Sequence, residues 1–356
     1  MECRWKQKKQ KSKYKNLIWS IVFIFLVVFT VRMIISQSEG LSPKQFWQMI
    51  RSSNPAWLIS GIISAGLFVW FEGVALCSIL KGIGYSSKLR QGFLYSTSDI
   101  YFSAITPSAT GGQPASAYFM LRDGIPGGVV TATLILNLMM YTISIVILGL
   151  FSIVLNPGAF FTFSLPAKVF IGIGFVALTA LALIFLLILK KGNWIFDLTA
   201  RIVQFLCRKH LLHGEKRKLA KIEKARSDYM ECASLFSGRP HLMGKALFWN
   251  LLQRASQMIV PVYLYFAMHG DAKNGFVIFA KQCLVTIGFN FVPIPGGMGI
   301  SDYLMLDGFR GLMSRDMAFQ LELLSRGITF YICVTISGII TLIGYLAGRK
   351  KHDRSL

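Results

Sequence analysis

The sequence contains two related stretches, Thr106-Pro107-Ser108-Ala109-Thr110-Gly111-Gly112-Gln113-Pro114 and Val292-Pro293-Ile294-Pro295-Gly296-Gly297-Met298-Gly299, and each interrupts an apolar segment. In both, a tyrosine follows seven residues after the first glycine of the pair, at Tyr118 and Tyr303. Proline stops a helix because it lacks the amide donor, and irregular backbone at membrane depth is tolerated only where protein or a wet cavity satisfies it. Two related breaks, one in each half of a membrane protein, therefore predict a central binding site of the kind found in transporters.

The composition around these stretches is that of a membrane protein. The chain has 356 residues, of which 54% are hydrophobic, and its apolar runs of about 20 residues are long enough to cross a bilayer. Its net charge of +22 lies beside these runs, where it indicates topology and attraction to anionic inner-leaflet lipids. We therefore expect no nucleic-acid partner. The six cysteines form no CxxC pair and no nucleophile–histidine pattern is present, so we expect no metal, no cofactor and no catalytic residue.

The apolar runs predict an all-α polytopic membrane protein with about six full transmembrane helices and two re-entrant helical hairpins. The full spans are predicted at Leu17–Ser36, Trp57–Leu80, Val129–Leu155, Ala167–Leu189, Leu242–Met268 and Ile328–Leu346, the last extended N-terminally by residues 318–327. The hairpins are predicted at Gly92–Leu121 and Phe276–Leu306. Apolar residues at helical spacing in Ile195–Leu206 predict an amphipathic helix on the cytoplasmic surface, followed by a polar helix around residues 216–236. A solvated basic loop is the alternative for this region.

The basic residues predict how the chain is oriented. The segments predicted to be inside carry seven, three, twelve and four Lys and Arg residues, and each outer segment carries two or fewer. The positive-inside rule places both termini on the cytoplasmic side of a cell membrane. It also predicts that the two hairpins enter the membrane from opposite sides. A transmembrane domain of residues 17–348 then lies between basic tails (1–16 and 349–356). Within it, residues 57–155 and 242–347 form an inverted repeat, with a basic cytoplasmic linker at 190–241.

The glycine pairs predict where a ligand binds. Glycine allows a sharp turn with a positive φ, and a helix that begins just after the pair presents free N–H groups and its positive dipole end to an anion. A phosphate or carboxylate fits such a site; a ligand-free turn is the alternative. Ionisable residues inside membrane segments are further functional candidates, namely Glu72, Asp99, Arg254, Lys281, Asp302, Glu322 and Arg326. Glu322 and Arg326 are four residues apart and can pair with each other, and Glu72 can pair with Arg254 or Lys281.

The two stretches, extended to Tyr118–Gly124 in the first case and to Asp302 in the second, resemble the signature segments of the lysylphosphatidylglycerol synthase transmembrane (flippase-like, UPF0104-type) family. The resemblance covers nearly all of the chain from the first to the last span. It implies that Asp302 takes the role of the acidic residue after the second motif and that Gln113 fits the acidic or amide position of the first. Where the family often has a basic residue, this sequence has Ser116. A direct cationic contact with a headgroup is therefore not expected there.

The family resemblance implies a function in lipid translocation. The full-length enzymes of the family add a cytosolic synthase domain, and this sequence ends soon after the last predicted span, so we expect the lipid-translocating part alone. The expected substrate is an anionic or aminoacylated phospholipid or a polyprenyl-phosphate lipid, and a homodimer is possible. Lipid modification with a separate catalytic partner and lipid binding without transport are the alternatives. The candidate substrate-binding residues are Gly111, Gly112, Gln113, Tyr118, Pro295, Gly296, Gly297, Gly299, Asp302, Tyr303, Arg254 and Lys281.

Overall fold

The structure is a computed structural model that describes residues 43–106, 110–208, 238–292 and 299–354, together with residues 219–220, 222–223, 226–227 and 236. It divides into two compact units, Met1–Ser52 and Ser53–Leu356. In the first unit the described part is helix α2 (Pro43–Ser52), in which the Arg51 guanidinium lies 5.5 Å from the centroid of the Trp47 ring. The predicted span at Leu17–Ser36 and most of the predicted helix at 216–236 lie outside the described residues.

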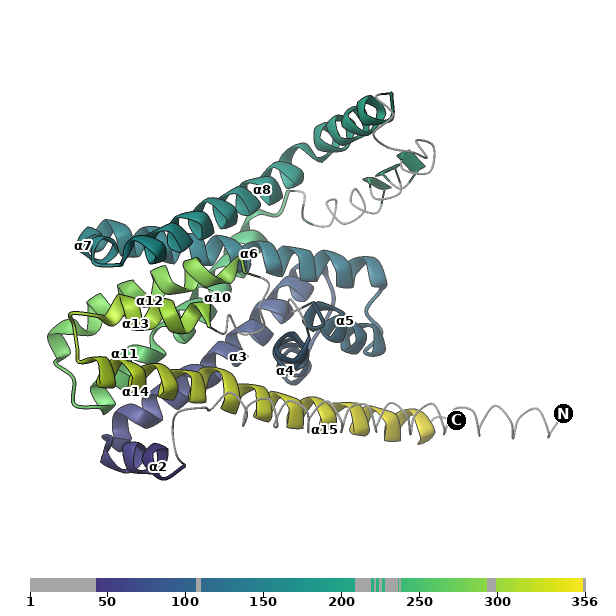
Figure 1. Cartoon of the computed structure of the whole chain (residues 1–356). Helices are drawn as coiled ribbons and strands as arrows, with labels where there is room; N and C mark the ends of the chain where they lie inside the picture. The colour runs from purple at the N-terminus through teal and green to yellow at the C-terminus, as the bar shows by residue number, and fades with distance from the viewer. Residues whose placement is uncertain are drawn as a thin grey trace. The chain divides into compact units, whose positions relative to one another are not determined.

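The described part of the second unit is helical throughout, without a strand (Figure 1). Its elements are α3 (Pro55–Ile83), α4 (Leu89–Ile105), α5 (Gly112–Arg122), α6 (Gly127–Leu155), α7 (Pro157–Phe161), α8 (Leu165–Arg208), α10 (Pro240–Met258), α11 (Val260–Ala267), the 3₁₀ turn η2 (Ala272–Asn274), α12 (Gly275–Asn290), α13 (Ile300–Phe309), α14 (Arg315–Arg326), the π-helical turn η4 (Gly327–Ile332) and α15 (Cys333–Arg354).

Within the described residues, four helical stretches are long and apolar enough to cross a membrane. They are Pro55–Ile83, Gly127–Leu155, Leu165–Leu187 and Arg315–Gly348, and they correspond to four of the six predicted full spans. Large apolar side chains are exposed along them, for example Ile63, Val154, Val176 and Ile343. Exposed side chains of this kind suit helices whose outer faces contact lipid tails instead of water. The composition of these helices confirms a membrane protein with several spans.

The predicted span at Leu242–Met268 is wrong as a single helix. The structure forms two shorter helices there, α10 and α11, which meet at Ile259. Pro261 lies in the first turn of α11, where its missing amide N–H interrupts the hydrogen-bond ladder of a continuous helix. The apolar pattern extends through this break, so hydrophobicity alone did not reveal it.

The predicted boundary between a span ending at Leu189 and a separate amphipathic helix is also wrong. The structure has one helix, α8, that runs from Leu165 to Arg208 without interruption. The segment Lys190–Trp194 contains no proline, so the backbone continues from the apolar part into the amphipathic part. The helix predicted at Ile195–Leu206 is therefore present as the C-terminal part of α8.

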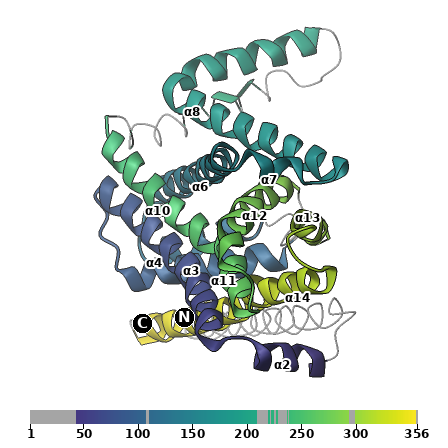
Figure 2. The ribbon, with the colours of Figure 1, turned by 90° about the vertical axis from the view of Figure 1, so that its left-hand side faces the viewer.

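Each broken segment is a pair of packed helices, α4 with α5 and α12 with α13. Figure 2 shows α12 beside α13. The pairs pack in a reciprocal way, because α4 contacts α15 of the second half and α12 contacts α6 of the first. The long helices α3 and α10 of the two halves also contact each other. Reciprocal contacts are expected of two related halves. The opposite membrane orientation of these halves stays a prediction.

The close approach of α3 and α4 positions the polar interior. A Cβ atom on Gly73 of α3 would lie 2.8 Å from the carbonyl carbon and oxygen of Gly92 in α4, so the two backbones touch at these glycines. Small residues allow membrane helices to approach in this way. As a result, Glu72, next to Gly73, faces the polar side chains one and two turns beyond Gly92.

Candidate functional site

The first break lies between the end of α4 at Ile105 and the start of α5 at Gly112. The Thr106 hydroxyl accepts a hydrogen bond from the Gly111 N–H at 2.8 Å and donates one to the Phe102 carbonyl oxygen at 2.6 Å. These bonds bring the start of α5 back against the last turn of α4. Residues Pro107–Ala109 lie outside the described part of the chain.

Gly111 and Gly112 allow close contact and not a positive φ. Gly111 has a φ of −81°, in the ordinary right-handed region, and neither glycine is among the positive-φ residues of the described chain. A Cβ atom on Gly112 would overlap the Asp99 carboxyl oxygen and the Ser103 hydroxyl, and one on Gly111 would overlap the Thr106 side chain. The predicted physical reason for this glycine pair was therefore wrong, since the glycines are needed to let α5 begin directly against α4.

The other predicted residues of the first break differ in their exposure. Gln113 is half-buried, and Tyr118 is exposed, with its ring centroid 6.4 Å from that of Tyr345. Ser116 is fully buried, and its hydroxyl donates to the Tyr95 carbonyl oxygen at 3.2 Å. The position at which the family often has a basic residue therefore joins the two helices of the hairpin in this chain.

A pair of carboxyl groups lies beside the first break. Glu72 of α3 is buried and Asp99 of α4 is half-buried, and their side chains lie within hydrogen-bonding reach of each other. Glu72 Oε2 also accepts from the Ser96 hydroxyl at 3.2 Å and from Gln253 Nε2 of α10 at 3.1 Å. Asp99 Oδ1 accepts from the Ser103 hydroxyl at 3.2 Å. Three helices thus contribute polar atoms to one buried cluster.

Arg254 of α10 supplies the positive charge of this cluster. Its guanidinium lies over two rings, 4.8 Å from the centroid of Phe68 and 4.1 Å from that of Tyr141, and Nη1 donates to Gln257 Oε1 at 2.8 Å. Stacking on aromatic rings offsets part of the cost of burying a cation. The predicted ion pair of Glu72 with Arg254 or Lys281 is not formed within the described residues, although the Arg254 charge acts on both carboxyls.

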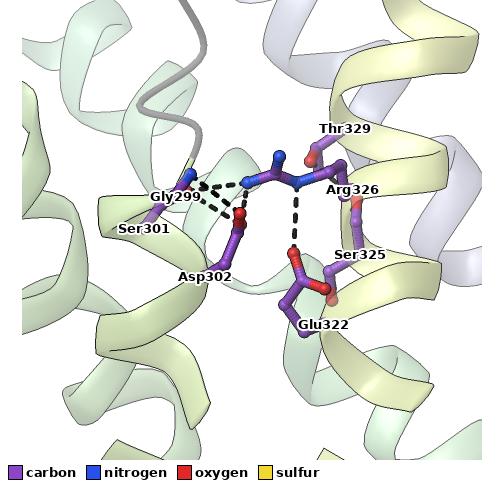
Figure 3. A network of polar contacts seen from close by, with 7 residues as sticks. All are labelled: Gly299, Ser301, Asp302, Glu322, Ser325, Arg326 and Thr329. Carbon is purple, nitrogen blue, oxygen red and sulfur yellow. Dashed lines mark hydrogen bonds and ion pairs between the residues drawn. The ribbon is translucent and has the colours of Figure 1, made fainter. Parts of the chain in front are cut away.

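The second break ends at Gly299, which precedes α13 and has a φ of 82° and a ψ of −53°. This left-handed conformation is strained for any residue with a side chain. The Gly299 N–H donates to Asp302 Oδ2 at 2.9 Å, and the Ser301 hydroxyl donates to Asp302 Oδ1 at 3.2 Å (Figure 3). The Asp302 carboxylate therefore occupies the positive N-terminal end of α13, where a bound anion was predicted.

Arg326 of α14 joins this end of α13 to the last span (Figure 3). Its Nη2 pairs with Asp302 Oδ1 and donates to the Ser301 hydroxyl at 3.0 Å, and its Nε lies 3.1 Å from Glu322 Oε1. The pairing of Glu322 with Arg326 is as the sequence predicts. The Asp302 side chain is 29% exposed and that of Glu322 is 8% exposed, so the network runs from an accessible surface into the interior. The π-helical turn η4 follows directly after Arg326, and such turns are frequent at functional sites.

Two other predicted residues have partners outside the Gly299–Asp302–Arg326 network. Lys281 of α12 is fully buried, its ammonium donates to the Gly308 carbonyl oxygen, and it lies 5.7 Å from the Phe163 ring centroid. Gly308 lies near the C-terminal end of α13, roughly 13 Å from Gly299 at the helical rise. The Tyr303 hydroxyl is 2.9 Å from the Ser164 hydroxyl. Pro295, Gly296 and Gly297 lie outside the described residues.

The sequence reasoning missed three partners: Ser96 and Gln253, which contact Glu72, and Ser301, which contacts Asp302 and Arg326. It also paired Arg326 with Glu322 and not with Asp302. A signal for the first cluster was present, because Asn250, Gln253, Arg254 and Gln257 follow one another at intervals of three, one and three residues in an apolar segment. This spacing places polar side chains on one face of α10.

Comparison with known proteins identifies the family. Residues 17–337 match the family described as the lysylphosphatidylglycerol synthase TM region. The chain is also similar to a UPF0104 membrane protein of Methanocaldococcus jannaschii, with 23% identity over 300 residues, which cover 83% of this chain and 87% of the relative. With the family match spanning most of the sequence and several helices suited to crossing a bilayer, the chain belongs to the lysylphosphatidylglycerol synthase transmembrane family and is a multi-pass membrane protein.

Proposed function

We propose that this protein moves lipids with anionic, phosphate-bearing headgroups between the two leaflets of a membrane. The observation that carries the proposal is the network of Gly299, Asp302 and Arg326 at the second helix break. It brings together an arginine, a helix N-terminus and a carboxylate at the edge of the protein interior. A phosphate is recognised by the first two of these groups.

In this proposal the Asp302 carboxylate occupies the headgroup site whenever no substrate is bound. In the absence of a substrate it accepts the Gly299 N–H and the Arg326 guanidinium, so neither donor is left unpaired. The phosphodiester of an arriving headgroup carries one negative charge on two non-bridging oxygens, as the carboxylate does, and can accept hydrogen bonds from the same donors. It therefore exchanges with Asp302, and the exchange reverses when the lipid leaves. Both states keep the donors satisfied, which lowers the barrier for a headgroup to pass.

The exposure of the network supports this exchange. Gly299 is exposed, the Asp302 side chain is 29% exposed and the Arg326 side chain is 14% exposed. A headgroup can reach Arg326 by displacing the more exposed carboxylate first. Glu322, the more buried carboxylate, holds the other edge of the guanidinium at 3.1 Å and keeps Arg326 in place during the exchange. The acyl tails remain in the bilayer, beside the exposed apolar faces of the spans.

A translocation assay tests the proposal. The purified full-length protein is reconstituted into vesicles with a headgroup-labelled phosphatidylglycerol, and a membrane-impermeant quencher reports the fraction of label that remains in the inner leaflet. We expect complete quenching with the protein and about half quenching in protein-free vesicles. A matched phosphatidylcholine probe, whose headgroup has no net charge, should cross more slowly.

The assay separates transport from the two alternatives. If the protein retains anionic lipid on purification but leaves half of the label protected, it binds lipid without transporting it, and the proposal is wrong. New aminoacylated lipid formed only when a soluble partner is added would instead favour lipid modification.

A further inference from the structure

We propose that Glu72 and Asp99 share a single proton and that this proton site couples lipid movement to proton movement. The inference extends the proposed function, since it names the ion that accompanies the lipid. The two carboxyls come from different helices and lie within hydrogen-bonding reach of each other. A hydrogen bond between two carboxyls requires that one of them carry the proton, because an ionised carboxylate can only accept.

The surroundings favour one proton over none. Ser96 and Gln253 both donate to Glu72 Oε2, and Ser103 donates to Asp99 Oδ1. The described elements around the pair bring one charged group to it, Arg254 of α10, and that guanidinium is shared with the rings of Phe68 and Tyr141. One cation can balance one negative charge. Two adjacent carboxylates would leave a second charge uncompensated in a buried place, which is costly.

Unused hydrogen-bonding atoms next to the pair provide a second, independent observation. Among the residues that the structure describes, Gln253 Oε1 and Arg254 Nε are buried and have no hydrogen-bond partner. Gln253 is 1% exposed and its amide nitrogen already contacts Glu72, so its free oxygen belongs to the same cluster. Buried polar atoms without partners are rare in stable proteins. Here they offer an acceptor and a donor to a proton-carrying water or to a substrate anion.

The position of Asp99 places this proton beside the first helix break, to which the proposed coupling also brings the anionic headgroup. The Asp99 carboxyl occupies the space that a Cβ atom on residue 112 would need. Gly112 is the first residue of α5. A negative charge on the pair and an anionic headgroup would compete for the positive end of α5 and for Arg254. Protonation of the pair therefore favours headgroup entry, and loss of the proton drives the headgroup out. Proton and lipid anion consequently move in the same direction.

Exposure indicates how the proton exchanges. Glu72 is buried, whereas Asp99 of α4 is half-buried and lies against Gly112, the first residue after the break. In this proposal Asp99, the less buried residue of the pair, exchanges the proton with the outside, and Glu72 stores it. A shared proton can pass from one carboxyl oxygen to the other along their hydrogen bond without any change in the backbone.

Infrared difference spectroscopy tests the proton site without relying on transport. The full-length protein in lipid should show the carbonyl stretch of a protonated carboxyl at neutral pH, and Glu72→Gln and Asp99→Asn should each abolish it. Glu322→Gln is the matched control, since Glu322 is a buried carboxyl paired with Arg326, and the band should persist in it. Absence of the band, its persistence in both variants, or its loss when sodium is added at constant pH would overturn the proposal.

A transport measurement tests the coupling. An imposed pH gradient should change the rate of anionic-lipid translocation by the wild type several-fold. It should not change the translocation rate of the Glu72→Gln variant. If the pH gradient does not change the wild-type translocation rate although the infrared band is present, the proposed coupling is wrong. If no lipid crosses at all, the proposed function fails, and the infrared band still decides whether the proton site exists.

Discussion

At the scale of single residues, Gly112 shows how a motif position is fixed by its neighbours. The carboxyl of Asp99 and the hydroxyl of Ser103 occupy the space that a side chain would need. We expect Gly112→Ala to destabilise the protein by about 1–3 kcal/mol, the usual cost of adding atoms to a packed interior. Thermal unfolding in detergent measures the effect.

Gly127→Ala is the matched control for this change. Gly127 is also the first residue of a helix, α6, and a Cβ atom there would meet Leu121 at an ordinary distance of 3.9 Å. This variant should unfold within a few degrees of the wild type. Equal unfolding temperatures for Gly112→Ala and the wild type would show that α5 does not begin against Asp99.

The charges around Arg326 predict an asymmetry between two substitutions. Arg326→Gln leaves Asp302 and Glu322 without their shared cation, and we expect a loss of about 2 kcal/mol, less than for a fully buried pair. Asp302→Asn leaves Arg326 paired with Glu322 and should cost about 1 kcal/mol. Denaturation curves of both variants measure the difference. A larger loss for Asp302→Asn would contradict the central place of Arg326.

At the scale of helices, the contact between α3 and α4 determines whether the polar cluster assembles. We expect Gly73→Leu to prevent folding or to expel α4, because its side chain would meet the Gly92 backbone and backbone cannot move aside. Gly66→Leu on the same helix should be tolerated, since Gly66 is exposed with no atom within 4 Å of an added Cβ. Monodisperse elution in size-exclusion chromatography distinguishes the two. Equal profiles would mean that the helices do not touch here.

The helices also show what the sequence could and could not predict. Pro/Gly stretches predicted both helix breaks, because these residues act on the local backbone. The break at Pro261 was missed, since the apolar pattern continues through it. The continuous helix α8 was predicted as two helices because its composition changes from apolar to amphipathic, although its backbone stays helical.

The site was predicted less completely than the helices. Asp302 and Arg326 were both recognised as candidates, but their pairing depends on how α13 packs against α14, which no local pattern specifies. The same holds for Glu72 and Gln253, which are 181 residues apart. Gly299 was a candidate from its residue type, but the positive φ was predicted for the glycine pairs, and its own φ of 82° was not.

At the scale of the whole molecule, the opposite orientation of the two helix pairs is open to a direct test. In a background without the six native cysteines, Gly127→Cys reports on the side reached after α5, and Asp316→Cys on the side reached after α13. Both positions are exposed. We expect a membrane-impermeant maleimide to label Asp316→Cys in intact cells and Gly127→Cys only after permeabilisation. Labelling of both from one side would contradict the inverted repeat.

The measurement that tests the proposed function most directly is the rate at which a labelled anionic phospholipid crosses vesicles containing Arg326→Gln. Loss of one charge-assisted contact of about 1.5–3 kcal/mol corresponds to a rate reduced roughly 10- to 100-fold. Arg315→Gln removes the same charge from the exposed first turn of the same helix and should leave the rate unchanged. Combining Arg326→Gln with Asp302→Asn and Glu322→Gln removes the unpaired carboxylates, so slow transport by this folded variant cannot be attributed to misfolding.

We predict slow crossing with both Arg326 variants and normal crossing with Arg315→Gln. Wild-type rates in both Arg326 variants would contradict the claim that the headgroup passes the second helix break.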